Sequence, residues 1–419
     1  METPEDELLL LIQQQNHHIQ NSPPKPRTST PKKMQRRASS SNTDDLSNMV
    51  CPIYFLKVFL LFLATGSSFS ILSVYLTRQT GVKPAKLRHV DHPCPEETNG
   101  LDRYIKPPSS LVHSMTDEEL LWTASFAPAI ENYPFNRTPK VAFLFLTMGP
   151  LPFAPLWEMF FKGHEGFYSI YIHALPTYVA KFTPDSVFYQ RFVPSKVAEW
   201  GQMSICDAER RLLANALLDI SNERFVLLSE SCIPLKDFNT TYNYLIMSKH
   251  SFVHIMEDGA RYNPNMAPEI NATVWRKGSQ WFEVSRELAL MIVSDSVYYP
   301  KILYFCQAHW CYPDEHYFPT ILHTEKPELL ANRSVTWVDW SRGGSHPATF
   351  GEADVKEWLM KWILDDQNCE YNGLNSTVCV LFARKFAPSA LETLVEVLSP
   401  TLLGLQQYGE GYNLNLSST

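Results

Sequence analysis

Three ionisable side chains follow one another in the run PDEHYF at residues 313–318: Asp314, Glu315 and His316. A proline followed by two acidic residues is typical of the first turn of a helix, so we expect a helix to begin here. One of the carboxylates could act as a general base that removes a proton from a hydroxyl group. The same carboxylates could instead only complement the positive end of the helix dipole. Both roles remain open at this point.

Two other runs combine features of a binding site. In WVDWSRGGSHP (residues 337–347), aromatic rings stand beside a glycine pair; such rings suit the C–H faces of sugars, and glycines permit close backbone approach. A core strand followed by an ordinary turn fits this run as well. In ARKF (residues 383–386), Arg384 and Lys385 end an expected strand just before a helix, where an anion such as a diphosphate is favoured, although a solvated basic pair is the alternative. Arg261, after EDG, is a weaker candidate and fits a polar turn.

The elements that must position these residues alternate between strand and helix from residue 140 onward. Expected strands lie at 141–147, 168–174, 225–231 and 252–257, and later at 334–340 and 377–385; expected helices lie at 153–162, 208–220, after Asp237, at 353–364 and at 388–398. This alternation predicts an α/β fold with a mostly parallel sheet covered on both faces, whose ligands bind at the carboxyl ends of the strands. The chain has no G-x-G-x-x-G and no Walker A motif, so dinucleotide and P-loop sites lose their main support.

One segment near the N-terminus is long and apolar enough to be a transmembrane helix. Residues 53–76 (IYFLKVFLLFLATGSSFSILSVYL) carry Lys57 as their only charge, and a helix of this length spans about 36 Å. A buried core helix or a cleaved signal peptide fits less well, because the segment begins far from the N-terminus and no small-x-small cleavage site is clear. Basic residues flank it equally, so charge does not orient it. All six N-x-S/T sequons follow it, which places the rest of the chain on the lumenal side. They begin at Asn136, Asn239, Asn271, Asn332, Asn375 and Asn415.

Composition and cysteines fit a secreted-compartment protein with a globular body. The net charge of −8 argues against a nucleic-acid partner, which would require a basic face. Of eight cysteines, Cys51 lies at the edge of the apolar segment and seven follow it, so we expect three disulfides and one free thiol. A zinc site lacks the paired C-x-x-C spacing. Residues 1–50 are expected to be a disordered tail on the cytosolic side, and residues 77–139 a lumenal stem with one capped helix at 116–122.

Seven runs in this order resemble the core-2/I-branching β-1,6-N-acetylglucosaminyltransferase family (family 14 glycosyltransferases), especially its plant branch. The runs are FLFLTMGPLPFAPLWEMFF, EWGQMSICDAERRLLANAL, ERFVLLSESCIPLKDF, GARYNPNM, WCYPDEHYFPT, WVDWSRGGSHPATF and VCVLFARKFAPSALE. The resemblance covers about residues 140–398, and it implies a catalytic domain at 140–400 followed by a tail at 401–419. It further implies a Rossmann-like fold of the GT-A type, type II Golgi topology, and inverting transfer from a UDP-sugar to a glycan acceptor without a metal or other cofactor.

The resemblance also implies roles for single residues. Glu315 falls on the family's catalytic base, and Lys385 on a lysine that contacts the UDP diphosphate. Trp340 and Arg261 fall on acceptor-side residues. His173 falls where animal members place an acid that contacts uridine, so that donor contact departs from the family pattern.

Two more positions bear on the donor site and on the disulfides. Cys369 and Cys379 match a short family disulfide. The family arginine just before the second cysteine is Ser376 here, and Arg384 could supply the missing charge beside Lys385. Many lumenal sugar transferases hold a metal through D-x-D after a central strand; this chain has Ser-Glu-Ser at residues 229–231 instead. Cations are therefore expected to neutralise the leaving diphosphate.

Several alternatives remain. Relatives transfer N-acetylglucosamine, xylose or glucuronic acid, and the acceptor can be a cell-wall polysaccharide, a proteoglycan or a mucin-type glycan. The chain could be a membrane-anchored glycan-binding protein that has lost catalysis. A metal-dependent hydrolase that uses residues 314–316 would require more ligands at helical spacing than the sequence contains.

Overall fold

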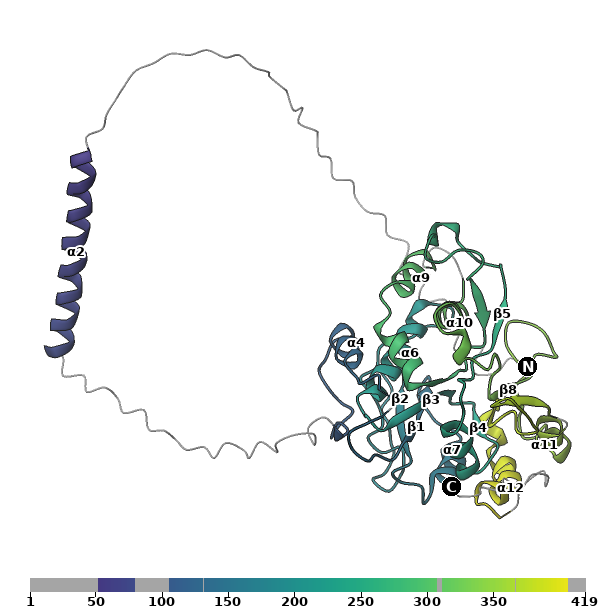
Figure 1. Cartoon of the computed structure of the whole chain (residues 1–419). Coiled ribbons are helices and arrows are strands. Elements are labelled where there is room, and N and C mark those ends of the chain that lie inside the picture. Colours follow the sequence, from purple (N-terminus) through teal and green to yellow (C-terminus); the bar gives the residue numbers. More distant parts are fainter. Residues whose placement is uncertain (1–51, 80–104, 131, 307–310, 366, 406–419) are drawn as a thin grey trace, which may run out of the picture. The chain divides into compact units, whose positions relative to one another are not determined.

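The computed structural model of the chain describes residues 52–79, 105–130, 132–306, 311–365 and 367–405 (Figure 1). The predicted tail at 1–50, residues 80–104 of the predicted stem, and residues 406–419 of the predicted C-terminal tail lie outside the described residues. The chain divides into two compact units, Met1–His92 and Pro93–Thr419, and each is described by itself.

In the first unit, helix α2 (Pro52–Gln79) covers the whole range predicted to be an anchor. The hydroxyl groups of Thr65, Ser67 and Ser68 donate hydrogen bonds to carbonyl oxygens four residues earlier, at 2.9, 2.6 and 2.8 Å, so they are satisfied within the helix. Among the helices that the structure describes, none combines the length and the apolar character needed to cross a membrane. Insertion of residues 53–76 in a membrane stays a prediction.

The second unit is built on a four-stranded sheet of order β2-β1-β3-β7. Strands β1 (Lys140–Leu146), β2 (Tyr168–His173) and β3 (Asn222–Ser229) are parallel, whereas β7 (Glu283–Ser285) runs antiparallel at the edge. The predicted α/β fold with a mostly parallel sheet is therefore confirmed. The antiparallel edge strand was not predicted, because three residues are too few to show a periodic pattern.

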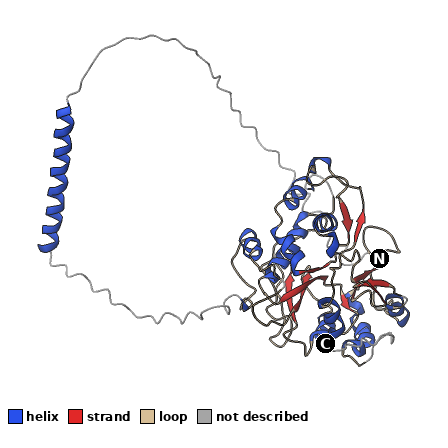
Figure 2. Cartoon of the chain, viewed as in Figure 1, coloured by secondary structure: helices blue, strands red, loops and turns tan. Residues whose placement is uncertain are grey.

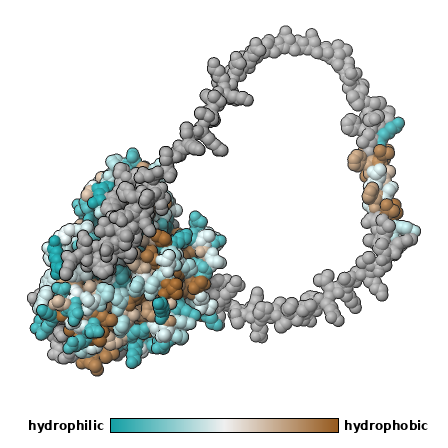
Figure 3. Space-filling view, turned by 180° about the vertical axis from the view of Figure 1, so that it is seen from behind, coloured by the Kyte–Doolittle hydropathy of each residue, from teal (hydrophilic) through white to brown (hydrophobic). Residues whose placement is uncertain are grey.

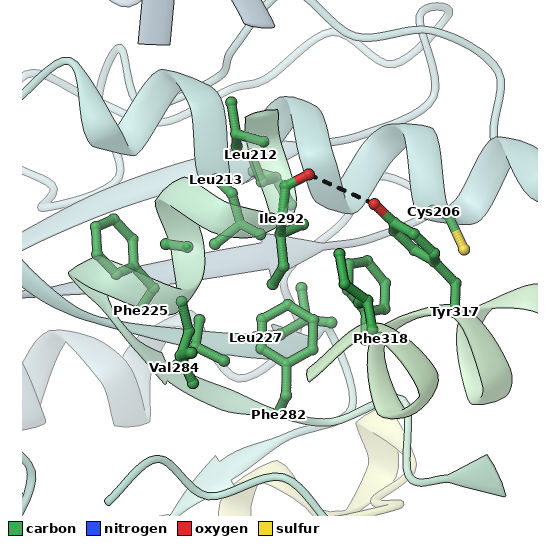
Figure 4. Packing of buried hydrophobic residues seen from close by; sticks show 14 of the residues in the cluster. Cys206, Leu212, Leu213, Phe225, Leu227, Phe282, Val284, Ile292, Tyr317 and Phe318 are labelled. Atoms are coloured by element: carbon green, nitrogen blue, oxygen red, sulfur yellow. Dashed lines mark hydrogen bonds between the residues drawn. The ribbon is translucent and has the colours of Figure 1, made fainter. Parts of the chain in front are cut away.

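Helices cover both faces of this sheet, and the residues of β1 alternate between two hydrophobic clusters. Ala142 and Leu144 join one cluster, and Phe143 and Phe145 join the other, because successive side chains of a strand point to opposite faces. The first cluster, part of which is shown in Figure 4, includes residues of α6 (Met203–Leu217), α8 (Arg286–Ser294) and α10 (Pro313–Glu325). The second includes residues of α5 (Ala154–Phe161), α7 (Phe238–Ile246), α11 (Glu357–Leu364) and α12 (Leu391–Leu402).

Three smaller sheets carry the loops that bear the candidate residues (Figure 2). Strand β11 (Phe382–Arg384) lies between β4 (Ile233–Pro234) and β8 (Thr336–Val338), and it is parallel to β8. Strands β5 (Ile255–Glu257) and β6 (Arg276–Gly278) form one antiparallel pair, and β9 (Cys369–Tyr371) and β10 (Leu374–Ser376) form another. The predicted strand at 252–257 thus contributes β5 to a separate two-stranded sheet.

Helix α4 (Asp117–Ser125) lies within the range predicted as stem, yet it is part of the folded unit. The predicted cap is present: Thr116 Oγ1 accepts from the Glu119 N–H at 3.2 Å, and Glu119 Oε2 accepts from the Thr116 N–H at 2.8 Å. Leu120 and Ala124 are buried in the cluster that includes α6 and α8. On the face of this unit in Figure 3, hydrophobic residues form separate patches among hydrophilic ones.

Candidate active site

Helix α10 begins at the PDEH run and separates its three ionisable side chains. Tyr312, the residue before the helix, has φ of 47° and lies in the left-handed region, so the chain turns sharply into Pro313. The side chain of Glu315 is 29% exposed, whereas Asp314 and His316 are 4% and 0% exposed. Glu315 is therefore the only one of the three that can meet a substrate.

The side chain of His316 is fixed inside the protein by a hydrogen bond and by ring stacking. Its Nδ1 donates to the Tyr312 carbonyl oxygen at 3.0 Å, and its ring stacks on Trp275 with centroids 4.6 Å apart. Burial lowers the pKa of His316 to about 4, so the ring is neutral. Over the described part of the chain, no group of three His, Cys, Asp or Glu side chains is arranged to hold a metal ion.

Lys277 is a site residue that the sequence did not reveal. It lies in β6, and its Nζ is 3.4 Å from Glu315 Oε2. The pairing of β5 with β6 places Lys277 opposite Met256 and carries it to the first turn of α10. No sequence pattern announces a strand of three residues within VWRKGSQWF.

Four side chains from separate loops form an aromatic cluster beside this turn. The ring of Trp200 lies 5.2 Å from Tyr312 and 5.2 Å from His346, and the guanidinium of Arg261 lies 4.4 Å from the Tyr312 ring centroid. Arg261, predicted on the acceptor side, is thus close to the turn that bears Glu315. Trp200, Tyr312 and His346 were not predicted.

Trp340, the other predicted acceptor-side residue, is 51% exposed and follows β8. Asp339 holds the loop after it: its Oδ1 accepts from the Ser341 N–H and its carbonyl oxygen from the Ala348 N–H, both at 2.8 Å. This closed loop also carries His346, a member of the aromatic cluster, so Trp340 and the cluster share one loop.

The predicted donor-side cations end β11, at the same edge as the end of β8. Arg384 is partly buried, and its guanidinium stacks on Trp281 at 4.0 Å from the ring centroid. Burial lowers the pKa of Arg384, and the nearby Cys232 and Glu230 act in the opposite direction. Lys385 follows, with its carbonyl oxygen accepting from the Phe350 N–H at 2.9 Å. The N–H of Phe386, directly after Lys385, donates to the Ser231 carbonyl oxygen at 3.1 Å, so both cations lie near the Ser-Glu-Ser end of β3.

His173, the remaining donor-side prediction, is buried at the end of β2 in a hydrogen-bonded network. Its Nε2 lies 2.8 Å from Arg211 Nη1 and 3.3 Å from the Lys196 N–H. Arg211 also donates to both carboxylate oxygens of Asp117, at 2.8 and 2.7 Å. Burial and the charge of Arg211 lower the pKa of His173 to about 3, so the ring is neutral and accepts. The network joins α4, β2 and α6.

A cavity of about 860 Å³ opens beyond the carboxyl end of β2. It is lined by residues 108–112 and by residues between 174 and 195, including Tyr178 and Phe192. None of the predicted donor or acceptor residues lines it, although Ala174 directly follows His173.

The disulfides differ in part from expectation. Cys369 and Cys379 are joined between β9 and the loop after β10, as the resemblance implied. A second bond joins Cys306 and Cys311, which was not predicted. The expectation of three bonds is wrong, because two cysteines are free and fully buried in different hydrophobic clusters, one on each face of the sheet. These are Cys206 and Cys232. Cys51 and Cys94 lie outside the described residues.

The five sequon asparagines within the described residues are all exposed, as attachment of a glycan requires. They are Asn136, Asn239, Asn271, Asn332 and Asn375. Asn415 lies outside the described residues.

Comparison with known proteins identifies the class of this α/β domain. Residues 141–364 match the Core-2/I-Branching enzyme family, and the chain belongs to that family. It is a glycosyltransferase. Among its relatives, Glycosyltransferase BC10 of Oryza sativa subsp. japonica is 38% identical over 297 residues, which cover 60% of this chain and 74% of the relative. Glu315 and Trp340 lie inside the matched family range, whereas Arg384 and Lys385 follow it.

Proposed function

We propose that this chain transfers a sugar from a UDP-sugar to a hydroxyl group of a glycan with inversion at the anomeric carbon, and that Glu315 is the general base. The observation that carries this proposal is the position of Glu315. It is the one accessible carboxylate of the PDEH run, and it is paired with Lys277. Tyr312, which precedes its helix, contacts the exposed ring of Trp200, and Trp200 contacts the exposed ring of His346. Sugars bind aromatic faces, so an acceptor would find both a surface and a base here.

In the proposed reaction, Glu315 removes the proton from the acceptor hydroxyl while the oxygen of that hydroxyl attacks C1 of the donor sugar. The bond between C1 and the UDP oxygen breaks on the opposite face, and UDP leaves with the bonding electron pair. Lys277 holds the Glu315 carboxylate until the acceptor arrives, and Arg261 and Trp340 contact the acceptor. A single displacement forms no covalent bond between sugar and enzyme.

The donor end depends on positive charge. Lys385 would contact the leaving diphosphate, and Arg384 would support it from a partly buried position next to the same strand end. The absence of D-x-D at the end of β3 favours transfer without a metal. The role of His173 in binding uridine is the least supported, because its Nε2 already faces two donors.

For the remaining features we propose a GT-A-type fold and a type II protein of the Golgi membrane, anchored by residues 53–76 with the catalytic domain in the lumen. The parallel strands of the central sheet and the exposed sequons support these proposals. N-acetylglucosamine is the donor sugar that the family name suggests; xylose and glucuronic acid are the competitors, and the acceptor class is a cell-wall polysaccharide, a proteoglycan or another glycan.

The test is a panel of UDP-sugars with the purified full-length chain, with and without a chelator. Glu315→Gln should abolish transfer and retain UDP binding, whereas Glu328→Gln, an exposed glutamate just after the same helix, should leave transfer unchanged. Wild-type transfer by Glu315→Gln would refute the assignment of the base. Loss of activity with chelator and its recovery with Mn²⁺ would refute metal-free transfer. Glycan binding without transfer or donor hydrolysis would identify a binding protein instead.

A further inference from the structure

A buried carboxyl group on α6 has one oxygen without a partner. Glu209 is 0% exposed. Its Oε1 accepts from Gln280 Nε2 at 2.8 Å, but its Oε2 has no hydrogen-bond partner among the described residues. A buried carboxylate oxygen without a donor from the protein is costly, because no protein group replaces its lost hydration.

A second such oxygen belongs to Asp314, directly before Glu315. Asp314 is 4% exposed, and its Oδ1 likewise lacks a partner in the described structure. Helices α6 and α10 pack against each other. Burial raises the pKa of Glu209, and the charge of Asp314 raises it further. Burial raises the pKa of the Cys206 thiol, one turn from Glu209, and the charges of Glu209 and Asp314 raise it further, so the three groups lie within electrostatic reach of one another.

The charged and titratable groups on the surrounding elements do not compensate two buried negative charges. On α6, Asp207 accepts a hydrogen bond from the Tyr299 hydroxyl, and Arg210 stacks on the Tyr299 ring at 3.9 Å. On β6, Lys277 pairs with Glu315. On α10, the Tyr317 hydroxyl donates to Asp295 at 2.9 Å.

We propose that Glu209 and Asp314 share one proton, in a hydrogen bond from a carboxylic acid at Glu209 Oε2 to the carboxylate of Asp314 at Oδ1, and that this bond positions the first turn of α10. One proton satisfies both unpartnered oxygens and removes one of two buried charges. Glu209 is then a positioning residue for Glu315, a role that rests on the proposed function, whereas the shared proton itself does not.

The first test is spectroscopic, with the full-length chain at neutral pH. A protonated carboxyl group gives a C=O stretching band that a carboxylate lacks, and we expect such a band to disappear in Glu209→Gln. Glutamine retains the acceptor for Gln280 and offers an N–H to Asp314, so the fold is preserved. Glu328→Gln, which replaces an exposed glutamate just after α10, is the control and should retain the band. An unchanged spectrum would overturn the proposal.

The second test is the pH dependence of unfolding. Because the pKa of Glu209 is higher in the folded state than in the unfolded state, the folded state binds more protons. Its stability therefore falls as pH rises from about 5 to 7. For each pH unit in this range, the shared proton should lower the folding equilibrium constant of the wild type about tenfold. Glu209→Gln lacks that proton and should not show this additional decrease. Equal slopes would also overturn the proposal.

The third test separates positioning from general packing. Glu209→Ala should lower kcat at least tenfold more than Glu209→Gln, with KM for the donor similar in both. Equal loss in both variants would refute the positioning role. If instead Glu315→Gln proves fully active, the role of Glu315 fails, while the carboxylic acid band and the pH slope still report on the shared proton.

Discussion

Replacement of Asp117 by asparagine tests whether α4 is an integral part of the folded domain. The hydrogen bonds from Arg211 lower the pKa of Asp117 from 3.8 to about 2, partly opposed by burial, with a smaller contribution from Lys196. A shift of that size corresponds to about 2.5 kcal/mol. The Asp117 side chain is 33% exposed, so solvent screening reduces the expected loss in Asp117→Asn to about 1.5 kcal/mol.

The measurement is urea unfolding of the full-length chain at several pH values. A lowered folded pKa means that the contribution is complete above the unfolded pKa and is lost as pH falls towards 2, so the difference between wild type and variant should shrink by about half between pH 7 and pH 3. Glu118→Gln is the matched control: Glu118 is exposed in the same helical turn, and no arginine among the described residues pairs with it. Equal effects of the two substitutions would show that only the helix dipole is involved and would refute the reasoning.

Three further outcomes follow from the described contacts. Joint replacement of Cys369 and Cys379 by alanine should lower the free energy of unfolding by about 2.5 kcal/mol, because the bond closes a loop of ten residues; no change in the urea midpoint would contradict this. Arg224 Nε lies 2.9 Å from the buried carboxylate of Glu283, and Arg224→Met leaves that carboxylate without its partner. The free energy of unfolding should fall by about 3 kcal/mol, and an unchanged urea midpoint would contradict this. Lys277→Met should lower kcat about tenfold with donor KM unchanged. A change in donor KM alone would show that Lys277 acts in donor binding and does not hold Glu315.

The central sheet could be predicted because its strands are long apolar runs with helices between them. β1 to β3 and helices α5 to α7 lie where the alternation placed them, and the capped start of α4 was also recognisable. The antiparallel strands β6 and β7 have three residues each, and what holds them is pairing with segments distant in the chain. Local pattern contains no information on such pairing.

The middle of α6 shows why part of the site was missed. Glu209, Arg210 and Arg211 look like a solvated helix face in the sequence, yet they are 0%, 5% and 4% exposed. Helices α4, α8 and α10 surround α6 on the sides that the sheet leaves open, so even its charged residues are enclosed and each requires a specific neighbour. The family resemblance pointed to Glu315 directly, but the residues that hold its turn come from α6 and β6.

The two free cysteines of the described residues allow local opening of the folded unit to be measured by thiol labelling. A thiol reacts with an alkylating reagent as the thiolate and only when exposed, and Cys206 and Cys232 are fully buried with raised pKa values. Each therefore becomes reactive only when its surroundings open. Because they lie on opposite faces of the central sheet, their labelling rates would time the opening of the α6 side and of the α5 side independently, in one unmodified molecule.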